Sequence, residues 1–193
     1  MILMCLMSLC LVLVNYITTI QVALKAKYIH SNELSVIIEN GLTLTDLSKS
    51  ANIIFGKLLA LEYLLIMIMN VVGTFLGLNI FRAFSTFEPT QILISFGGIS
   101  VVTTYAIKFY SYARVGQNLC NAYYEINDGL GKLLMSDGIC DKQRRELEFL
   151  VNRFSITSPI RPMDMFDMNY AHLAVLNNIM FTYNIILMQF KGY

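Results

Sequence analysis

Residues 63–81 read YLLIMIMNVVGTFLGLNIF, a run with no charged side chain. About 20 consecutive apolar residues are what an α-helix needs to cross the hydrocarbon core of a bilayer. The whole chain shares this character, because 56% of its 193 residues are hydrophobic and only 14% are charged. An average soluble protein has roughly 25% charged residues. The sequence therefore predicts an all-α, multi-pass membrane protein.

Four stretches of spanning length are predicted to be transmembrane helices. The first has neither the basic residues nor the small-residue cleavage site of a signal peptide, so we interpret it as a true span. The spans are expected at about 1–24, 58–81, 89–112 and 168–190. Apolar residues at helical spacing in 25–57 and 113–167 predict amphipathic cytoplasmic helices. The chain 1–193 is expected to form a single membrane domain.

The basic residues predict the orientation of these spans. All of the 14 Lys and Arg residues except Arg82 and Lys191 lie in or beside the two long segments between spans. Because cytoplasmic loops are enriched in Lys and Arg, both long segments are predicted to be cytoplasmic and the C-terminus extracellular. By parity the N-terminus is extracellular as well. A chain that starts there within an apolar run is expected to be the C-terminal part of a longer, truncated membrane protein.

Small residues mark the faces on which the helices are expected to pack. The second span contains a GxxxG motif, Gly73 to Gly77, and the third contains Gly97-Gly98. Small residues let two membrane helices approach closely, so packing within the subunit is the main interpretation and dimerisation the alternative. In the cytoplasmic segment before the second span, the helix is expected to break near Gly41 and residues 43–45.

No set of residues typical of catalysis or metal binding is evident. The only histidines, His30 and His172, are far apart in the sequence, and no Cys/His zinc spacing or phosphate-binding glycine loop occurs. The four cysteines are divided between the first span and the reducing cytoplasmic side, and are expected to be free thiols. We therefore expect no enzyme activity, no cofactor, no metal and no nucleic-acid partner.

The last apolar stretch carries polar residues on one side. On a helix that advances about 100° per residue, Thr182 aligns with Gln189 and Tyr183 with Phe190. Asn178 lies on the Thr182/Gln189 face. Unpaired polar groups in hydrocarbon are costly, so this face is predicted to point at other protein or at water. From the residues alone, an ordinary helix contact and the lining of a pore or transport path are both open.

The same stretch resembles a family signature. Thr182-Tyr183, five mostly apolar residues and then Gln189-Phe190, at the outer end of the last span, are similar to the signature of insect gustatory receptors, relatives of the insect odorant receptors. Asn184 departs from it, because the family usually has an apolar residue there.

Two other segments extend the resemblance. Pro-Met-Asp-Met-Phe at 162–166 leads into the last span as in the family, and Asn-Ile-Ile-Phe-Gly at 52–56 resembles a less specific recurrent stretch. The resemblance covers the whole chain loosely and residues 144–190 best.

The resemblance implies a fold and a function. Family receptors have seven spans, of which this chain would supply the last four, and they are tetrameric, ligand-gated, non-selective cation channels of the cell membrane. The last helix of each subunit lines the pore. Gln189 would form a ring of amide dipoles, and Phe190 a hydrophobic constriction. Thr182, Tyr183 and Asn178 would complete the pore and gate surface.

The implied partners are a small-molecule tastant, the lipid bilayer and other receptor subunits in a homo- or hetero-tetramer. Candidate ligand contacts at the depth of the family pocket are Asn70, Thr74, Asn79, Gln91 and Ser95, for which helix packing is the competing interpretation. The alternatives for the chain are a truncated, non-conducting receptor fragment or packing subunit, and a small membrane transporter. Metabotropic signalling is disfavoured by the inverted topology.

Overall fold

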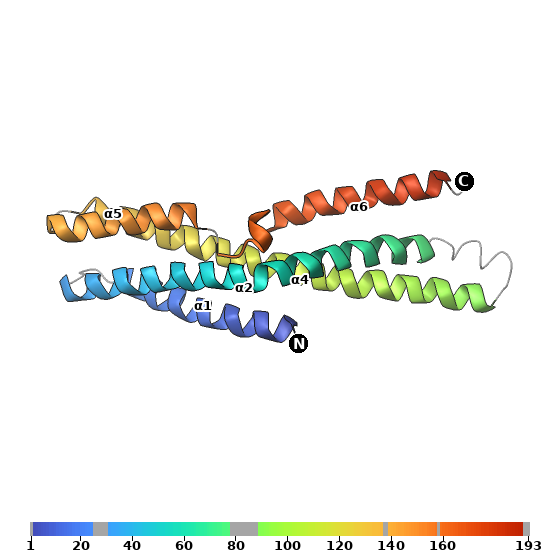
Figure 1. The fold of residues 1–193 in the computed structure, drawn as a ribbon, viewed down its shortest axis with the longest axis horizontal. Helices are drawn as coiled ribbons and strands as arrows, with labels where there is room; N and C mark the ends of the chain where they lie inside the picture. Colours follow the sequence, from blue (N-terminus) through green and yellow to red (C-terminus); the bar gives the residue numbers. More distant parts are fainter. Residues whose placement is uncertain (1, 25–30, 78–88, 137–138, 158, 191–193) are drawn as a thin grey trace. The chain divides into compact units, whose positions relative to one another are not determined.

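The computed structural model describes residues 2–24, 31–77, 89–136, 139–157 and 159–190, and these form an all-α protein. The elements, in chain order, are α1 (Ile2–Leu24), α2 (Ser31–Gly77), α4 (Pro89–Leu134), α5 (Asp141–Ile156), the 3₁₀ helix η1 (Pro162–Asp164) and α6 (Tyr170–Phe190) (Figure 1). α2 and α4 have 47 and 46 residues, more than twice the length that a membrane crossing requires. The all-α prediction is confirmed.

Three of the described helices are long and apolar enough to cross a membrane, which indicates a multi-pass membrane protein. They are Glu33–Gly77, Pro89–Leu134 and Tyr170–Phe190. Only 28%, 17% and 17% of their most apolar windows are buried inside the chain, so most of this apolar surface is left for lipid or for other protein. The predicted first span does form a helix, α1, of 23 residues, and the part of it whose side chains the structure describes, Cys10–Leu24, is shorter than a span.

The chain divides into two units. Unit 1 comprises Met1–Lys57 and Val115–Asp167, and unit 2 comprises Leu58–Arg114 and Met168–Tyr193. α2 and α4 run through both units without a break. The division points lie at, or within two residues of, the positions at which the sequence predicts the last three spans to begin or end. A single membrane domain over the whole chain stays a prediction.

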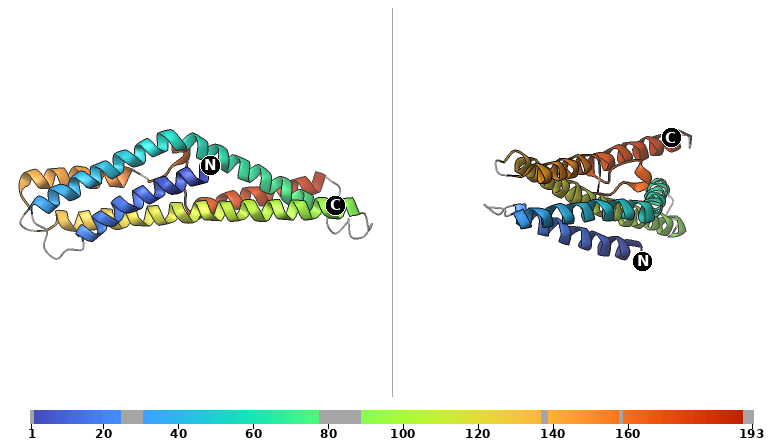
Figure 2. Two further views of the ribbon diagram at one scale, coloured as in Figure 1. Left: turned by 90° about the horizontal axis from the view of Figure 1, so that it is seen from below. Right: turned by 60° about the vertical axis from the view of Figure 1, so that its left-hand side comes forward.

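Unit 1 is a bundle of four helical segments with a core of aliphatic and aromatic side chains. The first part of α2, the last part of α4, α5 and α1 lie side by side in it (Figures 1 and 2). Its most deeply buried side chains include Leu13, Ile20, Ile37, Leu44, Ile126, Leu130, Leu147 and Leu150. These residues repeat at helical spacing, so the amphipathic pattern predicted for both long segments is confirmed. The same core also takes up one face of α1.

Polar contacts join the helices of unit 1 as well. The hydroxyls of Ser48 and Tyr123 are hydrogen-bonded at 2.5 Å between α2 and α4, and the Tyr123 ring lies 5.2 Å from that of Phe154 on α5. Arg153 on α5 forms an ion pair with Asp46 on α2. A buried hydroxyl that has a hydrogen-bond partner avoids the cost of desolvation. The Ser48–Tyr123 hydrogen bond therefore fixes how α2 and α4 meet.

The predicted break near Gly41 is wrong, because α2 is continuous from Ser31 to Gly77. A Cβ at Gly41 would lie 2.8 Å from the Leu150 side chain, so this glycine serves close packing against α5. The hydroxyls of Thr43 and Thr45 bond back to the carbonyl oxygens of Glu39 and Leu42, which lets both threonines stay in the helix.

Unit 2 is held by a close crossing of α2 and α4. A Cβ at Gly98 would lie 2.8 Å from the Gly73 carbonyl oxygen and 2.8 Å from the Gly77 amide nitrogen. The GxxxG motif therefore packs within the chain, as the main interpretation predicted. Further along, Glu62 on α2 faces Lys108 on α4 with 3.8 Å between the carboxylate oxygen and the amine nitrogen.

The two adjacent glycines of α4 allow a matched test of this crossing. We expect Gly98→Ala to lower the free energy of unfolding by about 1–3 kcal/mol, because the added methyl group meets backbone atoms that cannot move aside. A Cβ at Gly97 meets nothing within 4 Å, so Gly97→Ala should be neutral or slightly stabilising. Thermal unfolding of the purified variants in detergent measures both effects. Equal midpoints for the two variants would contradict the assigned crossing.

Candidate functional site

Among the residues that the structure describes, α6 buries only one of its faces. Leu176, Met180 and Asn184 are its buried residues, spaced four apart. Asn178, Thr182 and Gln189, the predicted polar stripe, are all exposed. At about 100° per residue, the middle of the polar stripe lies about 180° around the helix from the middle of the buried face. The stripe is therefore not a helix contact within the described part of the chain.

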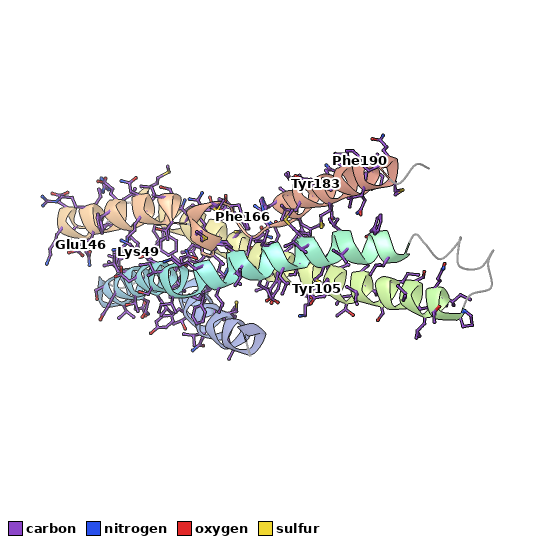
Figure 3. All side chains as sticks on the ribbon, turned by 45° about the vertical axis from the view of Figure 1, so that its right-hand side comes forward. Lys49, Tyr105, Glu146, Phe166, Tyr183 and Phe190 are labelled. Atoms are coloured by element: carbon purple, nitrogen blue, oxygen red, sulfur yellow. The ribbon has the colours of Figure 1, made fainter. Side chains whose placement is uncertain are left out.

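The aromatic pair predicted beside the stripe is also exposed. Tyr183 and Phe190 are 58% and 87% exposed on α6 (Figure 3). On the helical projection they lie between the polar stripe and the buried face. A turn of α6 of about 100° about its own axis would bring Phe190 to the direction in which Gln189 now points. The two residues of the predicted gate thus present different chemistry on neighbouring faces of one exposed surface.

Within the stripe, the amides are the groups that remain available to a neighbour. The Thr182 hydroxyl donates a hydrogen bond of 2.9 Å to the Asn178 carbonyl oxygen, one turn back in the same helix. Such a bond satisfies a hydroxyl donor in an apolar environment. The side-chain amides of Asn178 and Gln189 project from the exposed face and carry both donors and acceptors.

Asn184 is a polar residue of α6 that the sequence analysis did not assign to a face. Its side chain is 8% exposed, and its Oδ1 atom has no hydrogen-bond partner among the described residues. An unsatisfied amide oxygen inside a packed interface costs free energy. An apolar residue would therefore suit this buried position better than an asparagine.

The structure describes four of the five candidate ligand residues, Asn70 and Thr74 on α2 and Gln91 and Ser95 on α4, and their role as ligand contacts stays a prediction. Asn70 is buried and donates through Nδ2 to the Ile66 carbonyl oxygen at 2.9 Å, and the Thr74 hydroxyl bonds at 2.7 Å to the Asn70 carbonyl oxygen. Both side chains therefore donate their hydrogen bonds to the backbone of their own helix, α2. Ser95 is fully buried with no partner for its hydroxyl among the described residues. Gln91 is half-buried, and Asn79 lies outside the described residues.

Two cavities in unit 1 have the volume of a small-molecule site. One, of about 430 Å³, lies between α1 and α2 and is lined by residues that include Ile20, Glu33 and Asn40. The other, of about 480 Å³, lies between α2 and α5 and is lined by residues that include Glu39, Arg145 and Phe149. Both open to the surface. The second lies in segments that the sequence predicts to be cytoplasmic, whereas the first lies between the end of the predicted first span and the cytoplasmic segment that follows it. No group of three or more metal-binding side chains occurs among the described residues.

The structure also brings together two segments whose contact sequence reasoning missed. The backbone N–H of Arg161 donates to the Asn52 Oδ1 atom at 2.8 Å, and Gly56 lies against the backbone of Met163. Asn52, Gly56 and Met163 belong to the stretches 52–56 and 162–166, which the sequence singled out separately, and Arg161 directly precedes the second stretch. An asparagine and a glycine one turn apart in a helix were the signals available, because both residues are unfavourable in a helix interior and so indicate a special contact.

A comparison of the chain with models of known protein families finds no match, and neither does a comparison with curated proteins.

The buried amide of α6 gives a test of the face assignment. We expect Asn184→Leu to raise the free energy of unfolding by about 1–3 kcal/mol, because it removes a buried amide oxygen that has no partner among the described residues and keeps a similar volume. Asn178→Leu, on the exposed face of the same helix, is the matched control and should leave the unfolding midpoint unchanged. Thermal unfolding in detergent compares the two variants. A lower midpoint for Asn184→Leu would show that the amide has a partner and that the face is wrongly assigned.

Proposed function

We propose that this chain is a subunit of a ligand-gated, non-selective cation channel of the gustatory receptor type, in which α6 lines the pore. The observation that carries this proposal is the exposed polar stripe of Asn178, Thr182 and Gln189, opposite the face of α6 that packs within the chain. In hydrocarbon a polar face needs water or a polar partner. Several copies of α6 can surround a central axis with their polar stripes turned inward. The polar side chains of every stripe then meet water in one shared path.

The orientation supports the same assembly. With the basic residues of the long segments on the cytoplasmic side, α6 runs outward from Tyr170, and the Gln189/Phe190 pair lies at its outer end. The segments 31–57 and 115–167 are then cytoplasmic, and α1 packs on them in unit 1. A tetramer of such subunits, formed from identical or different receptor chains, places four Gln189 amides in one ring.

Gating follows from the two neighbouring faces of α6. With Phe190 turned to the axis, four phenyl rings form a hydrophobic constriction that closes by dewetting. Rotation of α6 moves the rings away and brings the Gln189 amides to the axis. A small-molecule tastant opens the channel if it binds the open arrangement more tightly than the closed one.

The same exposed stripe fits a second candidate, a non-conducting packing subunit. In that case a polar face on a different receptor subunit covers Asn178, Thr182 and Gln189, and the chain contributes no pore surface of its own. The two candidates differ in what the stripe faces, which is water in the channel and protein in the packing subunit.

Recording of tastant-evoked cation current tests the proposal and separates the candidates. The chain is expressed alone and together with other gustatory receptor subunits, and Gln189→Ala is compared with Gln117→Ala, a change of the same type on α4 in unit 1. We expect Gln189→Ala to bring the relative permeabilities of Na⁺, K⁺ and Ca²⁺ closer to their mobilities in free solution, because the amide ring is lost. Gln117→Ala should leave them unchanged. Permeability ratios that are unaltered by Gln189→Ala would contradict pore lining.

A further inference from the structure

The segment 159–167, which leads from α5 to α6, is docked on one turn of α2. The backbone N–H of Arg161 donates a hydrogen bond of 2.8 Å to Asn52 Oδ1. A Cβ added at Gly56 would lie 3.0 Å from the Met163 backbone nitrogen and 3.6 Å from the Arg161 carbonyl oxygen. A side chain at position 56 would therefore push the segment away from the helix. We call these contacts, between residues 52–56 and residues 159–167, the linker clamp.

In the segment 159–167, which we call the linker, one residue has an unusual backbone conformation. Met163 has φ 53° and ψ 24°, in the left-handed region that residues with a side chain rarely adopt. The Met165 N–H closes the turn on the Pro162 carbonyl oxygen at 3.1 Å, and Pro159, Ile160 and Pro162 are buried. A residue stays in this region only where its surroundings determine the conformation. The contacts with α2 are part of those surroundings.

Side-chain contacts continue from the clamp to the first turn of α6. Arg161 forms an ion pair with Asp167, with 3.2 Å between Nε and Oδ1, which joins the two ends of the linker after the Asn52 contact. Both side chains are about 40% exposed, so the pair contributes little to stability. Two residues further on, Asn169 Oδ1 accepts a hydrogen bond of 2.9 Å from the His172 N–H and caps the first turn of α6.

We propose that the linker clamp couples movement of α2 to movement of α6, with Asn52 and Gly56 as positioning residues. This inference rests on the proposed role of α6 as the pore helix. α2 is one continuous helix through both units, so a rotation or shift of α2 reaches Asn52 and Gly56 directly. The linker is held to those two residues by its own backbone. It is short and has little freedom to absorb the displacement, so it passes the displacement to the first turn of α6.

Hydrogen exchange tests the coupling without any need for current. Asn52→Ala removes the acceptor for the Arg161 N–H, and Asn152→Ala, on the exposed face of α5, is the control. We expect Asn52→Ala to speed exchange of the Arg161 and Met163 amides by about fivefold to tenfold, as the loss of one hydrogen bond implies. The proposal requires faster exchange in the first turn of α6 as well, at His172 and Leu173. Asn52→Asp keeps an acceptor oxygen and should restore the exchange of the unmodified chain.

A second pair of variants tests the close approach. Gly56→Ala places a methyl group against the linker backbone, whereas Gly131→Ala, in α4 of the same unit, meets nothing within 4 Å. In current recordings of the assembled channel, we expect Gly56→Ala and Asn52→Ala to raise the tastant concentration for half-activation about fivefold to tenfold. Single-channel conductance and ion selectivity should stay unchanged, because the pore surface is untouched. Both control variants should leave half-activation where it is.

The outcomes distinguish the coupling from the proposed function. Faster exchange confined to the linker, with no change at His172 and Leu173, would overturn the coupling and leave the clamp as local packing. An equal response of the Asn152 and Gly131 controls would overturn it too. Absence of current in every assembly would contradict the channel proposal alone, since the exchange measurement still decides whether the linker is coupled to α6.

Discussion

The structure depends on one constraint, which is that polar groups in hydrocarbon must find a partner. For the backbone this constraint selects the α-helix, and long helices account for nearly all of the described residues. For side chains it decides which faces can meet lipid. One face of α6 packs within its own chain and is apolar except for Asn184, whereas Asn178, Thr182 and Gln189 are exposed on the opposite face. That unsatisfied polar face is what the channel proposal explains.

The helices of the two units are packed in different ways. In unit 1 large side chains such as Leu44, Ile126 and Leu150 fill a core, as in a water-soluble helical bundle. In unit 2 the backbones of α2 and α4 approach at Gly73 and Gly98, and most of the apolar surface remains outside. Small residues at close crossings are how helices associate where lipid removes the hydrophobic driving force. The change in packing style within two continuous helices is what a passage from water into a bilayer would require.

Much of this fold could be predicted from the sequence because its signals are strong. Long uncharged runs and apolar residues at helical spacing predicted the helices, and the GxxxG motif predicted a close helix contact, which the structure forms between α2 and α4. The structural role was harder to predict for residue types that can serve two different purposes. Gly41 indicated a helix break, yet it lies within α2 against Leu150, since a glycine serves a turn and a close contact equally well. The side on which Asn184 lies, and the contact of Asn52 with the linker, depend on partners distant in sequence that periodicity does not identify.

The central claim is that the polar stripe of α6 faces water, and cysteine accessibility measures this most directly. After replacement of the native cysteines, single cysteines are placed along α6 from position 176 to position 189 in the assembled protein in membranes. They are then treated with a charged, membrane-impermeant thiol reagent. The account predicts rapid modification at Asn178, Thr182 and Gln189 and slow modification at Leu176, Met180 and Asn184. Uniform protection of all six positions, or modification that does not follow the helical period, would contradict it.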